Sequence, residues 1–93
     1  MMGRRLRNVK RMKTQSLQEE GPKLHVHPYE EVFLIQEGCA TYTIGLTTLE
    51  ARAGQIAIVP AGIPHKFINS GSGRLRQVDI HHSPQFVTQW LED

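Results

Sequence analysis

The chain has 93 residues, of which 39% are hydrophobic, and its formal net charge is +2. This length suffices for one domain with one core, and its single cysteine, Cys39, excludes an intrachain disulfide. The longest apolar runs, residues 32–35 and 56–59, fall far short of the roughly 18 residues of a membrane span, and no secretory signal follows the basic N-terminus, so we expect a cytoplasmic protein without a membrane partner.

Residues 1–20 are predicted to be a basic arm and a lead-in to a domain formed by residues 21–93. The arm carries 6 of the 11 basic residues between positions 4 and 13, where there is no acid. Clustered arginine and lysine contact phosphates in nucleic-acid-binding proteins. However, the arm lacks interleaved aromatic residues and the chain has no room for a helix-turn-helix domain. We therefore expect no nucleic-acid partner, and a translation start at Met12 is an alternative explanation of the arm.

From about Lys23 onward, short apolar or alternating segments are separated by glycine, proline or polar residues at close spacing. Glycine supplies the positive φ that tight turns need, and proline presets the bend. This pattern is typical of an all-β sandwich or barrel. The predicted strands are 24–27, 31–36, 40–44, 47–51, 55–59, 65–69 and 75–81.

Two apolar patterns in the sequence indicate what packs against the outside of the predicted strands. Residues 32–35 are apolar on both faces of their strand, so one face must be covered by something other than the barrel interior. We predict a homodimer for this reason, and because a short chain gains burial by association. After Pro84, apolar residues recur at positions 86, 87, 90 and 91, which places them on one face of a predicted short C-terminal helix.

The residues that indicate chemistry begin with His25 and His27, which project to the same face of a strand because they are two apart. Alone, this pair is equally compatible with surface histidines. Glu31 follows across a turn, and His65 comes from a separate hairpin. Three imidazoles and one carboxylate match borderline divalent first-row ions, and an octahedral ion would keep two positions for water or substrate.

The spacing of these residues resembles the two motifs of the cupin family. The first, G(X)5HXH(X)3–4E(X)6G, is matched by His25, His27, Glu31 and Gly38, while Gly21 lies four positions before His25 instead of six. The second, G(X)5PXG(X)2H(X)3N, is matched in full by Gly54, Pro60, Gly62, His65 and Asn69. The resemblance covers residues 21–69 by motif.

This resemblance implies a small antiparallel jelly-roll β-barrel over residues 21–93. It also implies one divalent metal ion, of the Zn, Mn, Fe, Ni, Co or Cu class, bound inside the barrel by His25, His27, Glu31 and His65. Glu30 is a competing carboxylate, but Glu31 has the family spacing.

Family members with such sites act as dioxygenases, isomerases or decarboxylases on small organic substrates, and we expect a metal-dependent enzyme of this kind. A non-catalytic cupin that binds or senses a small molecule is the alternative, and a purely structural barrel is less well supported because it would gather polar groups without a reason. The catalytic residues are not readable from the sequence. Only four residues besides the ligands are candidates for an acid or base: Tyr29, Tyr42, His81 and His82.

Overall fold

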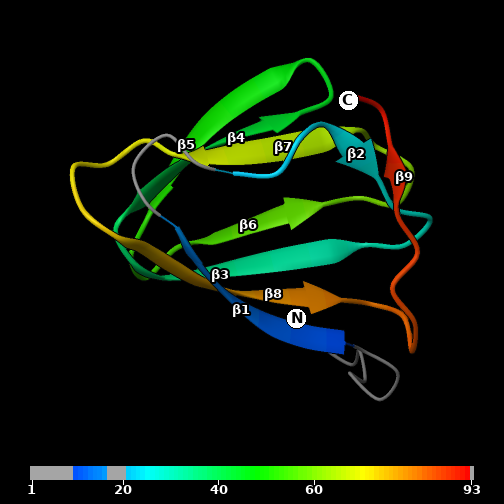
Figure 1. Ribbon diagram of the computed structural model, residues 1–93, viewed down its shortest axis with the longest axis horizontal. Coiled ribbons are helices and arrows are strands. Elements are labelled where there is room, and N and C mark those ends of the chain that lie inside the picture. Colours follow the sequence, from blue (N-terminus) through cyan, green and yellow to red (C-terminus); the bar gives the residue numbers. More distant parts are fainter. Residues whose placement is uncertain (1–9, 17–20, 93) are drawn as a thin grey trace.

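Antiparallel strands form two sheets that face each other (Figure 1). The computed structural model describes residues 10–16 and 21–92 of the chain. Sheet A has the order β1-β8-β3-β6, made of β1 (Lys10–Ser16), β8 (Leu75–His81), β3 (Glu31–Glu37) and β6 (Ile56–Val59). Sheet B has the order β5-β4-β7-β2-β9, made of β5 (Thr47–Arg52), β4 (Cys39–Ile44), β7 (His65–Asn69), β2 (His25–Val26) and β9 (Gln89–Trp90). The predicted all-β antiparallel fold is confirmed, with the described strands in two sheets rather than one closed barrel.

The hydrophobic core lies between the two sheets and follows from the alternation of side chains along each strand. In β3, Phe33 and Ile35 are buried while Val32 and Leu34 are only partly covered. The Phe33 ring lies 5.0 Å from the ring of Tyr42 and 5.4 Å from that of Phe67, within the range of favourable aromatic pairs. The buried apolar cluster consists of Phe33, Ile35, Ala40, Tyr42, Ala51, Ala57, Val59, Phe67 and Leu75.

Two motif glycines are required by the local backbone. Gly38, between β3 and β4, has a φ of +89°, and a Cβ there would lie 2.4 Å from the carbonyl oxygen of Arg74. Gly62 has a φ of +77° and donates its backbone N–H to the carbonyl oxygen of His27 at 2.8 Å. Both are left-handed conformations that favour glycine. The Gly62 bond joins the loop of the second motif to the histidine pair of the first.

The first strand belongs to the stretch that the sequence assigned to the arm and lead-in. Residues 10–16 form β1, which pairs with β8 along its whole length, from Lys10 opposite His81 to Ser16 opposite Leu75. β1 is thus the edge strand of sheet A (Figure 1). Most of the basic arm lies outside the described residues. The expectation that the arm binds no nucleic acid therefore stays a prediction.

The prediction of a C-terminal helix was wrong. Residues 89–90 form strand β9, which pairs with β2 so that Trp90 lies opposite His25. Leu91 donates its N–H to the carbonyl oxygen of Leu24 at 2.9 Å, so the backbone is satisfied by a neighbouring strand instead of by its own turns. A helical period read over six residues is weak support, and sheet pairing overrides it. No helix long and apolar enough to cross a membrane occurs in the described part of the chain.

Candidate metal centre

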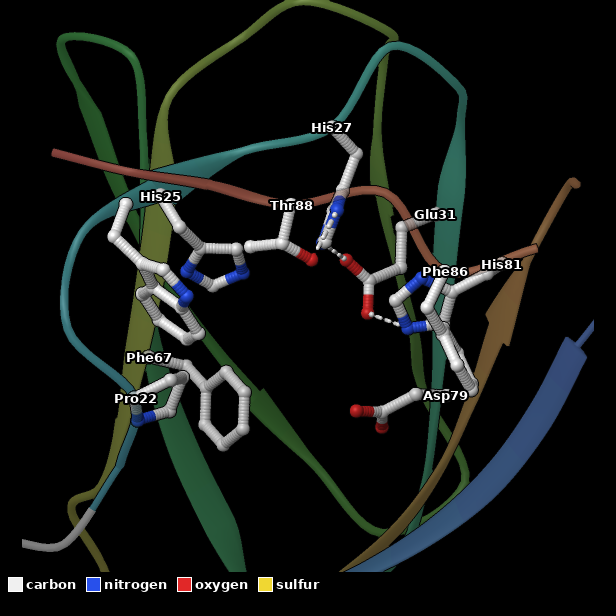
Figure 2. Close-up of a pocket in the computed structure, with 10 residues that line it drawn as sticks. Pro22, His25, His27, Glu31, Phe67, Asp79, His81, Phe86 and Thr88 are labelled. Atoms are coloured by element: carbon white, nitrogen blue, oxygen red, sulfur yellow. Dashed lines mark hydrogen bonds and ion pairs between the residues drawn. The ribbon is translucent and has the colours of Figure 1, made fainter.

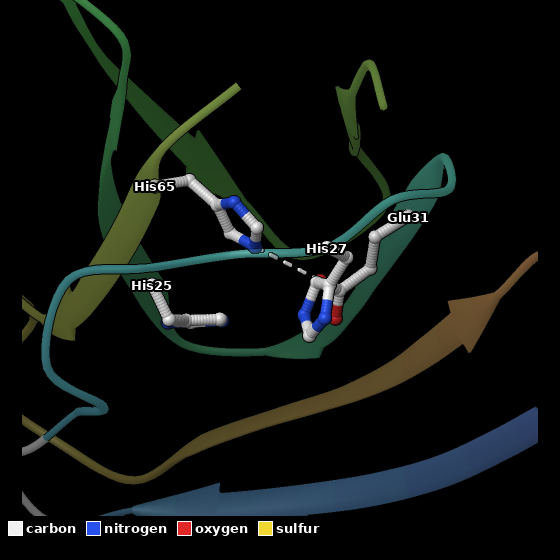
Figure 3. A group of neighbouring side chains, drawn as sticks. All are labelled: His25, His27, Glu31 and His65. Carbon is white, nitrogen blue, oxygen red and sulfur yellow. Dashed lines mark hydrogen bonds and ion pairs between the residues drawn. The ribbon is translucent and has the colours of Figure 1, made fainter. Parts of the chain in front are cut away.

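The four predicted ligands come together at one end of the space between the sheets (Figure 3). His25 in β2 lies opposite His65 in β7 in the strand register, so sheet B brings these two rings side by side. Glu31 begins β3 in sheet A and projects inward, as does His27 just after β2. All four side chains are buried, and one ligand atom from each lies within 4.8 Å of the others.

Each of the three histidine rings is oriented by a hydrogen bond to a backbone carbonyl. Because a carbonyl oxygen only accepts, the Nδ1 atom of each ring must donate. The bonds run from His25 to Lys23 at 2.7 Å, from His27 to Val87 at 2.8 Å, and from His65 to Ile63 at 3.0 Å. With Nδ1 engaged in this way, Nε2 is the ring nitrogen left to face the group: it donates to Glu31 when it carries a proton and can bind a metal when it does not, and such backbone bonds are typical of metal-binding histidines.

Glu31 is the hub of the group. Its Oε1 atom lies 3.1 Å from His27 Nε2 and 3.0 Å from His65 Nε2, and its Oε2 atom lies 3.1 Å from His81 Nε2. Burial alone would raise the pKa of this carboxyl, but the hydrogen bonds from the three imidazoles hold it well below its ordinary value. Glu31 is therefore an anion at neutral pH and offers a charged oxygen to any cation bound among the rings.

The two histidines of the first motif have opposite electrostatic settings. Burial lowers the pKa of His25, and the neighbouring rings of His65 and His27 lower it further. Burial also disfavours the charged form of His27, but the hydrogen bonds to Glu31 and Val87 outweigh it and raise the pKa. A metal ion at Nε2 would replace the proton that the His27–Glu31 contact holds, so metal binding and protonation compete at this ring.

His81 is joined to the group by a hydrogen-bonded chain that the sequence did not reveal. The Tyr29 hydroxyl is hydrogen-bonded to His81 Nδ1 at 2.8 Å and accepts the backbone N–H of Val87 at 3.3 Å. Because a carboxylate only accepts, His81 Nε2 donates to Glu31 Oε2 at 3.1 Å. Glu31 and His81 are opposite each other in the register of β3 and β8, which explains the contact. Of the candidate acids and bases, His81 and Tyr29 adjoin the site, whereas His82 does not line its pocket.

Strand β8 turns a polar face inward. Gln77, Asp79 and His81 are buried, and the Tyr42 hydroxyl donates a hydrogen bond to Gln77 Oε1. Burial, followed by the negative charge of Asp79, raises the pKa of Tyr42. Alternation shows that positions 77, 79 and 81 share a face. However, alternation alone does not say which face is the inner one, so Gln77 and Asp79 were not predicted.

A pocket of about 300 Å³ opens beside the group (Figure 2). The C-terminal segment crosses its mouth, with the Phe86 ring 4.7 Å from that of His81 and the Trp90 ring 5.0 Å from that of His25. This segment also supplies the Val87 carbonyl that orients His27. The remaining lining residues are Pro22, His27, Glu31, Phe67, Asp79 and Thr88.

Comparison with known structures identifies the fold. A Klebsiella pneumoniae protein with a double-stranded β-helix domain has a TM-score of 0.83 and 23% identity, covering 92% of this chain and 76% of that one. Bacillus subtilis oxalate decarboxylase, described with Mn(II) centres, has a TM-score of 0.83 and 21% identity, covering 90% of this chain but 24% of that one. Oxalate decarboxylase from Lactobacillus farciminis has a TM-score of 0.82 and 20% identity, covering 90% and 27%. At these identities the likeness shows the fold alone.

Sequence comparison identifies the family. An uncharacterized Streptomyces coelicolor protein is 39% identical over 41 residues, which is 44% of this chain. The match spans 39% of that curated relative's length. The model of the cupin domain family matches residues 14–81, which is most of the chain and includes both motifs. The chain therefore belongs to the cupin family.

Proposed function

We propose that His25, His27, Glu31 and His65 bind one divalent first-row metal ion, and that the protein is a metal-dependent enzyme for a small organic substrate. The observation that supports the metal site is that a backbone carbonyl occupies Nδ1 of each of the three rings, which leaves Nε2 for a metal, while one ligand atom from each of the four residues lies within 4.8 Å of the others. Two open positions would remain on an ion with four protein ligands and a coordination number of about six. The cavity beside the group supplies the space for a substrate.

The chemistry that follows is set by the residues around the ion. When bound, a divalent metal supplies Lewis acidity to an oxygen ligand of the substrate or activates water or dioxygen. Glu31 balances the positive charge, and the buried rings keep bulk water from the ion. His81 Nε2 holds the Oε2 atom of Glu31 in place at 3.1 Å, and the Tyr29 hydroxyl holds the His81 ring through Nδ1 at 2.8 Å.

A cupin that binds a small molecule without turnover is the second candidate function. It is favoured by His81, because both of its ring nitrogens are already engaged, one by Tyr29 and one by Glu31. An acid or base that is committed to structural bonds on both sides is a poor proton carrier. Incubating the metal-loaded protein with candidate substrates and following oxygen uptake and product formation separates the two functions.

The proposal includes a homodimer that forms through the outer face of sheet A. In the strand register Val32 lies between Ile58 and Ile80, and Leu34 lies between Ile56 and Val78, which makes a continuous apolar grid. Ile56 and Ile58 are 60% and 55% exposed, whereas Val78 is buried, so the β6 side of this face is open to a second copy. A dimer mass in light scattering is expected at micromolar concentration, and a monomeric mass would contradict it. The cytoplasmic location stays a prediction.

The metal site is tested by elemental analysis of protein purified without a histidine tag. We expect about one equivalent of a first-row metal per chain, and loss of that metal from His65→Ala. The matched control is His82→Ala, which removes an imidazole that does not line the pocket and should retain the metal. A wild-type protein that holds no metal and is not stabilised by added Mn, Fe, Co, Ni, Cu or Zn salts would overturn the proposal.

A further inference from the structure

We propose that the C-terminal segment, residues 86–92, is a positioning element of the metal centre, and that docking of this segment and metal binding strengthen each other. This inference deepens the proposed function and rests on it, because it takes the four residues of the site to hold a metal ion. It assigns a role to a segment that lies across the site without belonging to the buried apolar cluster.

The backbone of Val87 supports two of the four ligands. Its carbonyl oxygen accepts the hydrogen bond of His27 Nδ1 at 2.8 Å. Its N–H donates to the Tyr29 hydroxyl at 3.3 Å, and that hydroxyl is bonded to His81 Nδ1 at 2.8 Å. His81 Nε2 in turn donates to Glu31 at 3.1 Å. One residue of the segment thus orients His27 directly and Glu31 through two intermediate side chains.

Two further residues of the segment contact the histidines of the first motif. Thr88 Oγ1 lies 3.3 Å from His27 Nδ1, and the Trp90 ring lies 5.0 Å from the ring of His25. Figure 2 shows the segment running past His27 beside the pocket, which Thr88 and Trp90 both line. Groups that orient a metal ligand from behind usually raise metal affinity. Docking of the segment should therefore tighten metal binding.

Few bonds hold the end of this segment on the fold. Strand β9 has two residues and lies at the edge of sheet B (Figure 1). Beyond it, Leu91 donates its N–H to the carbonyl oxygen of Leu24 at 2.9 Å. Glu92 Oε1 accepts the N–H of Leu24 at 2.8 Å, and Glu92 Oε2 lies 3.4 Å from Lys66 Nζ. Glu92 therefore fastens the segment at an exposed position, away from the ligand atoms.

The segment is also loosely packed. Its large apolar side chains are 43–59% exposed: Phe86, Val87, Trp90 and Leu91. A second cavity of about 320 Å³ adjoins the segment, and His27 and Thr88 line both this cavity and the pocket of the site. Segments with few buried apolar contacts and solvent-exposed backbone hydrogen bonds open locally at low free-energy cost. The docked and undocked states of the segment should therefore exchange without unfolding of the core.

These two properties couple the segment to the metal. When the segment opens, His27 loses the carbonyl that holds its ring, and a ring free to rotate binds a metal more weakly. Conversely, a metal at His27 Nε2 fixes the ring with Nδ1 directed at Val87, which favours docking. Linkage requires that the two effects be equal, so the factor by which docking tightens metal binding is the factor by which metal tightens docking.

The first measurement is the affinity for Zn²⁺, by competition with a chromophoric chelator. Glu92→Ala removes the acceptor of the Leu24 N–H and should weaken zinc binding about tenfold, the lower end of the usual loss for an orienting group. Glu92→Gln keeps an oxygen acceptor but removes the charge, so it should restore most of the affinity. Glu50→Ala removes a carboxylate from an exposed position on β5 and should leave the affinity unchanged.

The second measurement is amide hydrogen exchange at Leu91, whose N–H is bonded only while the segment is docked. Saturating zinc should slow this exchange by about the same factor of ten. The amide of Ser70, bonded to the Cys39 carbonyl at 3.1 Å at the opposite end of the fold, should not respond. Tyr29→Phe removes the acceptor of the Val87 N–H and should weaken zinc binding and reduce the effect of zinc on Leu91.

The outcomes separate this inference from the metal site. If zinc binds equally to wild type and Glu92→Ala, or if zinc does not slow exchange at Leu91, the inference is overturned and the metal centre stands. If Glu92→Gln loses as much affinity as Glu92→Ala, the loss comes from charge instead of docking, and the inference is again overturned. A wild-type protein that contains no metal and takes up no zinc overturns the proposed function and the coupling together.

Discussion

The two ends of the space between the sheets are built from the same strands but contain opposite chemistry. Along β3 the inward side chains run from Glu31 to Phe33 and Ile35, and along β7 they begin with His65 and continue to Phe67. One end thus holds the ionisable cluster, and the middle and the other end hold the apolar core, in which Gln77 and Asn69 are buried polar exceptions. Two residues of strand, about 7 Å, separate the two environments.

This difference shows how a small domain can stay folded while it buries a polar site. Burying ionisable groups costs free energy even when they are paired, whereas burying aromatic rings supplies it. The core end stabilises the fold, and the rigid strands carry that stability to the side chains of the site. Substitutions at the core end should therefore act on folding through lost packing, and substitutions at the site end through lost charge partners and lost metal binding, which the following predictions test in order of decreasing effect.

The largest effect is expected at the core end. Phe33→Ala should lower the free energy of unfolding by about 3–5 kcal/mol, because it removes a ring that is 1% exposed and contacts Tyr42 and Phe67. Urea unfolding of the metal-free protein measures this. Leu46→Ala is the control, since this fully exposed side chain should change stability by less than about 0.5 kcal/mol. Equal effects from the two variants would contradict the division.

At the site end, Glu31→Gln should destabilise the metal-free protein by about 3 kcal/mol, because three imidazoles lose their anion. The pKa of Glu31 is depressed, so its stabilisation is present above its ordinary value of 4.5 and is lost as the pH falls below it. The pKa of His27 is raised, so its stabilisation is present below 6.5 and is lost as the pH rises.

The difference in stability between wild type and Glu31→Gln should therefore be greatest between about pH 4.5 and 6.5 and smaller at pH 3. Urea unfolding at a series of pH values, with a chelator present throughout, gives the curve. A difference that does not vary from pH 3 to pH 8 would show that Glu31 is not the hub of the cluster.

Metal addition should raise the free energy of unfolding, because the bound ion offsets the free energy spent on burying the ionisable groups of the site. A ligand that binds only the folded chain stabilises it by about 2.7 kcal/mol when its concentration is 100 times the dissociation constant. We expect thermal unfolding to shift upward with the bound metal in the wild type. The same addition to His25→Ala should have little effect, and equal shifts in both proteins would place the metal elsewhere.

The smallest effect concerns the support of the site. His81→Ala should lower metal affinity about 10- to 100-fold, the usual cost of removing a partner that orients a ligand. His81 bonds the outer oxygen of Glu31, so the loss should appear in affinity while the metal still binds. Competition with a chromophoric chelator measures it, with His82→Ala as the neighbouring control. Complete loss of metal in His81→Ala would make His81 a ligand instead of a positioning residue.

The sequence by itself determined most of the strands and which four residues would gather as the candidate metal site. The alternation of apolar and polar residues depends only on the two-residue period of a strand, and glycines with positive φ, such as Gly38, limit where strands end. The spacing from His25 to Glu31 spans one turn, which keeps both side chains at the same end of the fold, and the facing of sheets A and B brings them together.

The tertiary structure decided what surrounds those ligands. Period-2 alternation groups Gln77, Asp79 and His81 on one face of β8, but only the packing of sheet A against sheet B shows that this face points inward. The C-terminal residues form β9 because they pair with the backbone of β2. The spacing of apolar residues over positions 86–91 carries no information about that pairing. Contacts between distant segments depend on register and sheet order, and these are properties of the whole chain.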